Sequence, residues 1–236
     1  MKESIDHPTC PHCGVTVDPQ QTQCPSCGAS ISQAAQESAP TVREMPLRER
    51  AGRDVAVFGN VRALCFAAML AAMSLILGKF LQIPNPFHEI IRISFENLPV
   101  ILAGMTMGPL VGAMTGIVAD LLGCALYGYA INPLITLGAA VVGLTAGIMS
   151  GYVVRRPMLL RVIVATVTAH LLGSVLVKSL GLAAWYLASY NMGFWELVAW
   201  RLLTYAIIAV AECALLYLLQ RHRAFGTFIE RMRKRK

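Results

Sequence analysis

Charged residues are scarce in this sequence: Asp, Glu, Lys and Arg make up 14% of the 236 residues, while 56% of the residues are hydrophobic. Soluble domains carry about 25% charged residues, so this composition excludes an ordinary soluble domain. The chain also lacks a Gly-x4-Gly-Lys-Ser/Thr loop, a Gly-x-Ser-x-Gly elbow and a His-Glu-x-x-His pair. An enzyme is therefore not expected, and any transport would take its energy from a partner or an ion gradient.

Basic residues outnumber acidic residues by 20 to 13, which gives a formal net charge of +7. They are not spread along the chain but lie in clusters between apolar stretches. This arrangement is typical of a membrane protein with charged loops, whereas a nucleic-acid-binding domain gathers basic residues on one polar surface. We therefore expect contact with a membrane and none with nucleic acid.

The distribution of residue types divides the chain into four segments. Residues 1–30 are polar and hold four of the seven cysteines. Residues 31–56 are rich in Ser, Gln, Ala, Pro, Arg and Glu without apolar periodicity, and this composition predicts a flexible linker. Residues 57–220 are almost continuously apolar and form the expected transmembrane domain, and residues 221–236 form a basic tail.

The number of membrane-spanning helices depends on how residues 90–125 are divided, because a single span gives five helices and a break at Gly108-Pro109 gives six. With six helices, the three basic clusters all fall on one side of the membrane, as the positive-inside rule requires. We therefore predict an all-α membrane protein, a six-helix transmembrane bundle with both termini in the cytoplasm. The expected helices cover residues 57–81, 91–106, 108–125, 132–153, 159–187 and 194–219.

The N-terminal segment carries two Cys-x2-Cys pairs, each followed by glycine. Cys10 and Cys13 form the first pair, and Cys24 and Cys27 form the second. Four thiolates at this spacing are typical of a closed, structural zinc site, and a segment this short needs a metal to fold. The sequence therefore predicts a small zinc ribbon with four cysteine ligands. Two redox disulfides are the alternative, which the expected cytoplasmic side disfavours.

Placing an ionisable side chain inside the membrane costs free energy, so such residues are first interpreted as functional. In the six-helix topology most of them fall in the outer half of the membrane, and aromatic residues of the outer loops join them. Aromatic walls with a few charges predict a pocket for a flat polar ligand. Ion pairing that only assembles the bundle is the alternative, for example between Asp120 and Lys178 or Arg201.

Small residues recur at four-residue spacing, which lets helices approach closely in lipid. The glycine rows at residues 104–116 and 143–151 indicate packing inside the bundle. The alanine row formed by Ala63, Ala67 and Ala71 is interpreted as a face of the first helix that docks a partner.

Residues 58–220 resemble the substrate-binding S component of an energy-coupling factor (ECF) vitamin transporter of the folate type. The resemblance rests on Arg92-Ile-Ser-Phe95, on the run from Leu98 to Ala113, on the segment from Gly116 to Gly123 and on the alanine row. It implies a bacterial plasma-membrane protein that captures a vitamin from outside. It also implies a transmembrane coupling subunit, docked on the alanine row, and two cytoplasmic ATPases that drive uptake.

The resemblance, together with the buried polar residues, implies a folate-like ligand. Arg92, Lys178 and Arg201 would face the ligand carboxylates, Glu96, Asp120, Asn132 and Thr136 would bond a heterocycle, and Trp185 and Trp195 would cover it. The segment from Asn132 to Thr136 departs from the more aromatic folate-type pattern, so riboflavin, thiamine and pantothenate remain alternative ligands. A zinc-ribbon membrane scaffold or sensor without transport is the alternative function.

Overall fold

We describe a computed structural model of the chain, which divides into two compact units, Met1–Pro46 and Leu47–Lys236. The structure describes residues 26–27 of the first unit and residues 57–84, 92–154, 157–190, 193–222, 225–226 and 229 of the second. The predicted zinc ligands Cys10, Cys13 and Cys24 lie outside the described residues, as do most of the predicted linker and tail.

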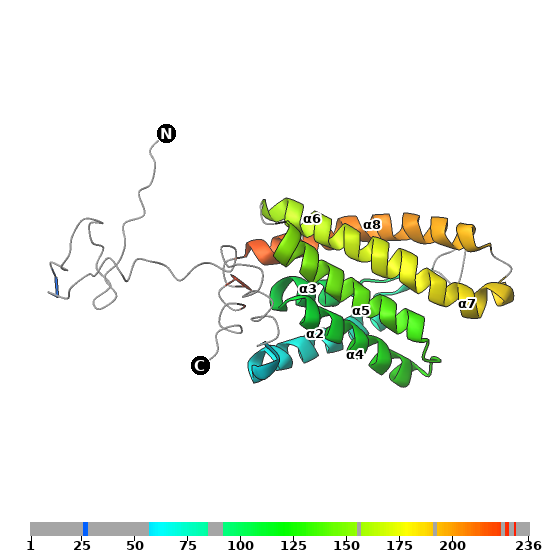
Figure 1. Cartoon of the computed structure of the whole chain (residues 1–236), viewed down its shortest axis with the longest axis horizontal. Coiled ribbons are helices and arrows are strands. Elements are labelled where there is room, and N and C mark those ends of the chain that lie inside the picture. Colours follow the sequence, from blue (N-terminus) through cyan, green and yellow to red (C-terminus); the bar gives the residue numbers. More distant parts are fainter. Residues whose placement is uncertain are drawn as a thin grey trace. The chain divides into compact units, whose positions relative to one another are not determined.

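The second unit is a bundle of helices, drawn from cyan to orange in Figure 1. The all-α class predicted from the sequence is confirmed, and each of the six expected helical segments is present. A short 3-10 turn, η2 at Val57–Gly59, precedes the first helix, and the single helices are α2 Val61–Phe80, α3 Asn97–Met107, α4 Pro109–Tyr127 and α8 Phe194–Arg221. The helix α5 Pro133–Ile148 continues as the π-helix η3 Met149–Val153. The fifth segment is continuous from α6 Met158–Ala169 through the π-helix η4 His170–Val177 to α7 Lys178–Tyr190.

Within the described residues, five of these segments are long and apolar enough to cross a membrane, and α3 is shorter, with 11 residues. A helix of that length rises about 16 Å, roughly half of the hydrocarbon thickness. The expected start of this helix at residue 91 is wrong, because Arg92–Ile93 forms the strand β2, paired antiparallel with β1 at Ile83–Pro84. The helix begins only at Asn97, two residues before Pro99, whose missing amide is tolerated in a first turn.

The predicted break between α3 and α4 is confirmed at Gly108. This residue has φ 107°, a left-handed conformation that glycine adopts without strain. Pro109 follows as the first residue of α4, where its fixed φ suits a helix start. The corner turns the chain back, so α3 and α4 run side by side in opposite directions.

A seam of glycines joins α3, α4 and α5. A Cβ on Gly104 or on Gly112 would press on the carbonyl oxygen of Gly143, and a Cβ on Gly143 would press on the carbonyl of Gly112. A Cβ on Gly147 would meet the backbone of Pro109. The three helices therefore touch backbone to backbone, as close approach in lipid allows. We call this set of residues, Gly104, Gly112, Gly143 and Gly147, the glycine seam.

Candidate ligand-binding site

A cavity of about 450 Å³ opens at the end of the bundle opposite the glycine seam. Its wall comes from the last turns of α2 and α4, the first turns of α3 and α5, and α7 and α8. We call this the cavity end. The volume lies within the range of about 300–1,000 Å³ that small-molecule sites occupy.

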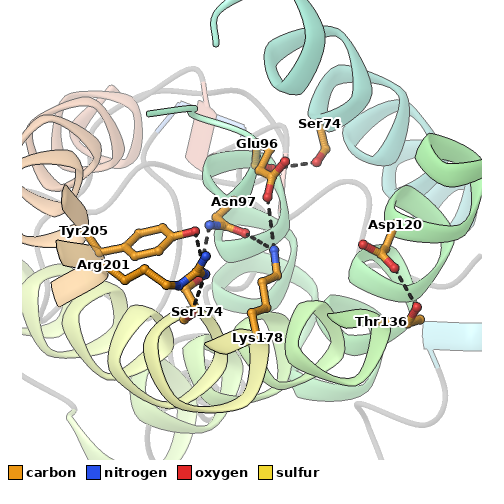
Figure 2. Close-up of polar contacts among 9 residues, drawn as sticks. All are labelled: Ser74, Glu96, Asn97, Asp120, Thr136, Ser174, Lys178, Arg201 and Tyr205. Atoms are coloured by element: carbon orange, nitrogen blue, oxygen red, sulfur yellow. Dashed lines mark hydrogen bonds and ion pairs between the residues drawn. The ribbon is translucent and has the colours of Figure 1, made fainter. Parts of the chain in front are cut away.

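Lys178 stands at the centre of the polar residues in the cavity wall (Figure 2). Its ammonium group donates to Glu96 Oε1 at 3.0 Å and to Asn97 Oδ1 at 3.5 Å. Lys178 is 6% exposed, so desolvation makes this ion pair necessary for the lysine to stay charged. Ser74 donates to the backbone carbonyl of Glu96 at 2.6 Å and fixes the turn that carries the carboxylate.

Arg201 is the second buried cation of the cavity wall, with 6% exposure. Its Nη2 donates to the carbonyl of Ser174 at 2.6 Å and to Tyr205 Oη at 3.4 Å, and the guanidinium lies 5.2 Å from the centre of the Tyr205 ring. Its buried Nε has no hydrogen-bond partner, and no carboxylate of the described part of the chain pairs with this side chain. A buried cation with only neutral partners favours an anion in the cavity.

Polar groups also line the α4–α5 side of the cavity, separated from Arg201 by Lys178 in Figure 2. Thr136 donates to Asp120 Oδ2 at 2.6 Å. Asn132 caps α5 by accepting from the Leu134 amide at 3.0 Å, and its side-chain nitrogen donates to the Gly181 carbonyl at 2.9 Å. Asn132 is thereby fixed between α5 and α7, and Asp120 keeps a second oxygen toward the cavity.

Aromatic side chains line the entrance. Tyr127 and Tyr129 meet edge to face with ring centroids 6.2 Å apart, and both belong to the cavity wall. The Tyr127 hydroxyl donates to the Leu75 carbonyl at 3.0 Å, and the Lys79 ammonium lies 4.9 Å from the Tyr127 ring centre. Two tyrosines and a cation therefore form the rim between α2 and α4.

The π-helix η4 explains how Arg201 finds its backbone partner. The amide of Lys178 bonds the carbonyl of Gly173, five residues back, rather than that of Ser174, four residues back. This wider turn leaves the Ser174 carbonyl accessible to Arg201. π-helical segments are rare and frequently mark functional sites.

The structure brings together five of the nine predicted ligand contacts in the cavity wall: Glu96, Asp120, Asn132, Lys178 and Arg201. Thr136 lies behind this wall and bonds Asp120. Trp195 is 79% exposed and is not among the wall residues, so its expected role as a cover stays a prediction. The side chains of Arg92 and Trp185 lie outside the described part of the chain.

Several wall residues were not predicted as ligand contacts. The most informative are Asn97 and Tyr205. Tyr127 and Tyr129, by contrast, belong to the aromatic outer-loop residues that the sequence predicts for the pocket wall, and both lie in it. Asn97 and Tyr205 become recognisable only once the helices are placed, because each bonds a cation from another turn or another helix.

The alanine row predicted to dock a partner is buried inside the bundle: Ala63 is 0%, Ala67 9% and Ala71 2% exposed. The expectation that this row faces outward is therefore wrong. The exposed small residues of α2 are Ala68 and Ala72, one position further along the same turns. Of the predicted zinc ligands, only Cys27 is described, and it is exposed on a turn.

These observations define a class of protein. Apolar helices carry large hydrophobic side chains on their outer surfaces, and one end of the bundle encloses a polar cavity with two buried cations. The chain is a multi-pass membrane protein with a candidate small-molecule site inside the bundle.

Comparison with known proteins identifies the family. Residues 62–219 match the family described as "ECF transporter, substrate-specific component", and the chain belongs to this family. The description of the family names its members as the substrate-specific components of transporters.

Two individual proteins are similar to this chain. The folate transporter FolT of Clostridium novyi (strain NT) is 32% identical over 68 residues, which are 29% of this chain and 38% of that relative's own length. A solved structure described as "Crystal structure of FolT bound with folic acid" has 25% sequence identity and a TM-score of 0.55, and the likeness covers 70% of this chain and 97% of the other.

Proposed function

We propose that this chain captures a folate-like vitamin in the cavity described above, for ATP-driven uptake by partner subunits. The observation that carries the proposal is Arg201, a buried guanidinium in the cavity wall whose contacts in the described part of the chain are with neutral groups. Folates bring carboxylates, and a carboxylate would supply the missing counter-charge through a strong charge-assisted hydrogen bond. Both similar proteins carry folate in their names or descriptions, which supports the same ligand class.

The rest of the wall suits the other end of such a ligand. Asp120 and Asn132 offer acceptors and donors for a flat heterocycle, and the tyrosines of the rim offer aromatic faces. Lys178 is already neutralised by Glu96, so it contributes hydrogen-bond donors more than net charge. Arg201 and Lys79 add positive charge to the wall and Asp120 adds one negative charge, so the wall as a whole favours an anionic ligand over a cationic one.

Equilibrium binding of radiolabelled folic acid to the purified full chain tests this proposal. Riboflavin, thiamine and pantothenate serve as competitors, because they are the alternative ligands and differ in charge. We expect folic acid to bind most tightly, and thiamine to compete least, because its cationic ring meets Arg201, a buried cation whose described partners are neutral. Tighter binding of riboflavin, thiamine or pantothenate than of folic acid would contradict the folate assignment.

We also propose a location in the bacterial plasma membrane, with both termini in the cytoplasm and the cavity open to the outside. The clusters of basic residues support this orientation. The proposed partners are a transmembrane coupling subunit and two cytoplasmic ATPase subunits. The exposed Ala68 and Ala72 on α2 support a docking surface there, because small residues four positions apart let another helix approach closely.

Co-purification with the coupling and ATPase subunits tests the docking surface. Ala68→Leu should abolish co-purification, because the larger side chain separates the two helices. Ala206→Leu is the matched control, since Ala206 is also exposed but lies on α8. Loss of the complex with Ala206→Leu and not with Ala68→Leu would place the docking surface elsewhere. Recovery of no ATPase subunit with the wild-type chain would instead favour the scaffold or sensor.

The N-terminal segment is proposed to bind one structural Zn²⁺ through Cys10, Cys13, Cys24 and Cys27. The spacing of the four cysteines supports this site. Metal analysis of the purified chain should give one zinc per chain, and Cys10→Ser with Cys13→Ser should remove it. Cys65→Ser is the control, because Cys65 belongs to α2 in the sequence and is not one of the four proposed ligands. Zinc that survives the double substitution would contradict the site.

A further inference from the structure

A second buried polar cluster lies outside the cavity wall. His170 Nε2 and Glu212 Oε2 are 2.7 Å apart, and the two residues are 3% and 0% exposed. His170 is the first residue of η4, and Glu212 lies on α8 eleven residues beyond Arg201, about 16 Å along the helix. Neither residue is in the cavity wall, so neither contacts a ligand bound there.

The pair is not explained by stability alone. His170 Nδ1 and Glu212 Oε1 are buried without a hydrogen-bond partner in the described part of the chain. Two apolar side chains of similar size would stabilise a bundle at least as well as a half-satisfied ionisable pair. A requirement other than stability is therefore the better account of these residues.

The contacts of His170 lead to the cavity. Its ring stacks on Tyr205, with centroids 5.0 Å apart and planes inclined by 27°. Tyr205 is in the cavity wall and supports Arg201 with both its ring face and its hydroxyl. The other support of Arg201 is the carbonyl of Ser174, which belongs to η4 like His170. Both supports of Arg201 therefore depend on the segment that the His170–Glu212 bond ties to α8.

We propose that His170 is a positioning residue that acts through Tyr205 to hold Arg201 ready for the ligand, and that Glu212 fixes the imidazole ring in the orientation this requires. Preorganised side chains bind more tightly because less conformational freedom is lost on binding. Two measurements test this role. The first, folic acid binding, rests on the proposed folate ligand, whereas the second uses the ligand-free protein and is independent of that proposal.

Two substitutions of His170 separate ring stacking from simple packing. His170→Leu removes the ring face, and we expect folic acid binding to weaken about tenfold. His170→Phe keeps an aromatic face against Tyr205 but loses the bond to Glu212, and we expect a loss of affinity of about threefold, smaller than that of His170→Leu. In an Arg201→Gln background, His170→Leu should have no further effect, because an effect transmitted through Arg201 is not additive with its removal.

Two further variants control for folding. His170→Leu with Glu212→Leu leaves no unpaired carboxylate, and it should show the same tenfold loss with unimpaired thermal stability. Leu216→Ala removes a fully buried side chain one turn beyond Glu212, and it should lower thermal stability while leaving the folic acid affinity unchanged. An unchanged affinity in the double variant would overturn the positioning role.

The second measurement is the ¹⁵N resonance of the Arg201 Nε–H group in the ligand-free protein, assigned by its absence in Arg201→Lys. We expect it to shift and broaden in His170→Leu and to shift less in His170→Phe, which keeps the ring face but not the bond to Glu212. An unchanged resonance in His170→Leu would refute the proposal. It would also be refuted if His170→Leu lowered the affinity as much in the Arg201→Gln background as in the wild type. If the wild type binds no folic acid, the folate assignment fails, and the resonance still decides the role of His170.

Discussion

The two ends of the α4–α5 pair have opposite construction. At one end Gly112 and Gly143 bring the two backbones into contact, with no side chain between them. At the other end the same helices carry Asp120 and Asn132 and form part of a cavity of about 450 Å³. The difference teaches that a tight contact and an open site can share two helices when small residues occupy one half and polar residues the other.

The largest effect is expected from a substitution that separates α4 from α5 at the glycine seam and so removes the difference between the two ends. Gly143→Val places methyl groups against the carbonyl of Gly112, a backbone atom that cannot move aside. We expect a loss of more than about 3 kcal/mol of stability, above the usual range for overpacking. The measurement is the yield and the thermal unfolding of the monodisperse protein.

Gly151→Ala is the control for the seam, because a Cβ at Gly151 meets nothing within 4 Å among the described residues. It should unfold at nearly the temperature of the wild type. Normal stability of Gly143→Val would mean that the seam is looser than the structure indicates.

The second change acts at the cavity end. Arg201→Gln removes the buried cation, and we expect folic acid affinity to fall about 100-fold, or roughly 3 kcal/mol, as for other buried charged contacts. Binding assays on the purified chain measure the loss. Arg201→Lys should fall in between, because lysine keeps the charge and loses the planar fork.

Arg62→Gln is the matched control for Arg201, since Arg62 is exposed on α2. It should bind folic acid like the wild type. Equal affinities for Arg201→Gln and Arg62→Gln would exclude Arg201 as the anion contact.

A smaller effect is expected at Lys178, because Glu96 already neutralises it. Lys178→Met should weaken folic acid binding about tenfold and also lower the thermal stability, since it breaks the ion pair between Lys178 and the Glu96 carboxylate. Adding Glu96→Gln should restore the stability and not the affinity. Calorimetric melting and binding on the same samples separate the two quantities, and recovery of affinity in the double variant would assign Lys178 a structural role only.

The smallest effect is expected at Thr136, which bonds Asp120 from behind the cavity wall. Thr136→Val should weaken folic acid binding about fivefold, or about 1 kcal/mol, the value of one hydrogen bond. Thr168→Val is the control, because Thr168 bonds only carbonyls of its own helix among the described residues. Equal affinities of the two variants would mean that Asp120 keeps its orientation without Thr136.

Much of the bundle was predictable, because apolar length and the Gly108-Pro109 corner are local signals. The convergence of Glu96, Asp120, Asn132, Lys178 and Arg201 also followed, since the topology alone brings those helix ends to one side. The start of α3 was missed because an apolar run of residues does not distinguish a helix from an extended segment that leads into it.

Two features required the folded chain. The row of Ala63, Ala67 and Ala71 and the pair of Ala68 and Ala72 have the same four-residue spacing. In a membrane helix the lipid-facing side is also as apolar as the buried side, so hydrophobicity does not distinguish them. Only the neighbouring helices decide which row is covered. The π turn at His170–Val177 has no sequence signal known to us in this segment, and it is this turn that leaves the Ser174 carbonyl to Arg201.

The glycine seam also limits how a captured molecule can leave. Parting α4 from α5 to open a route toward the far side would break contacts between main-chain atoms along several turns. The seam therefore holds α4 and α5 together on the side of the bundle away from the cavity. The uptake proposed above would then have to move these two helices together as one body, with the seam intact.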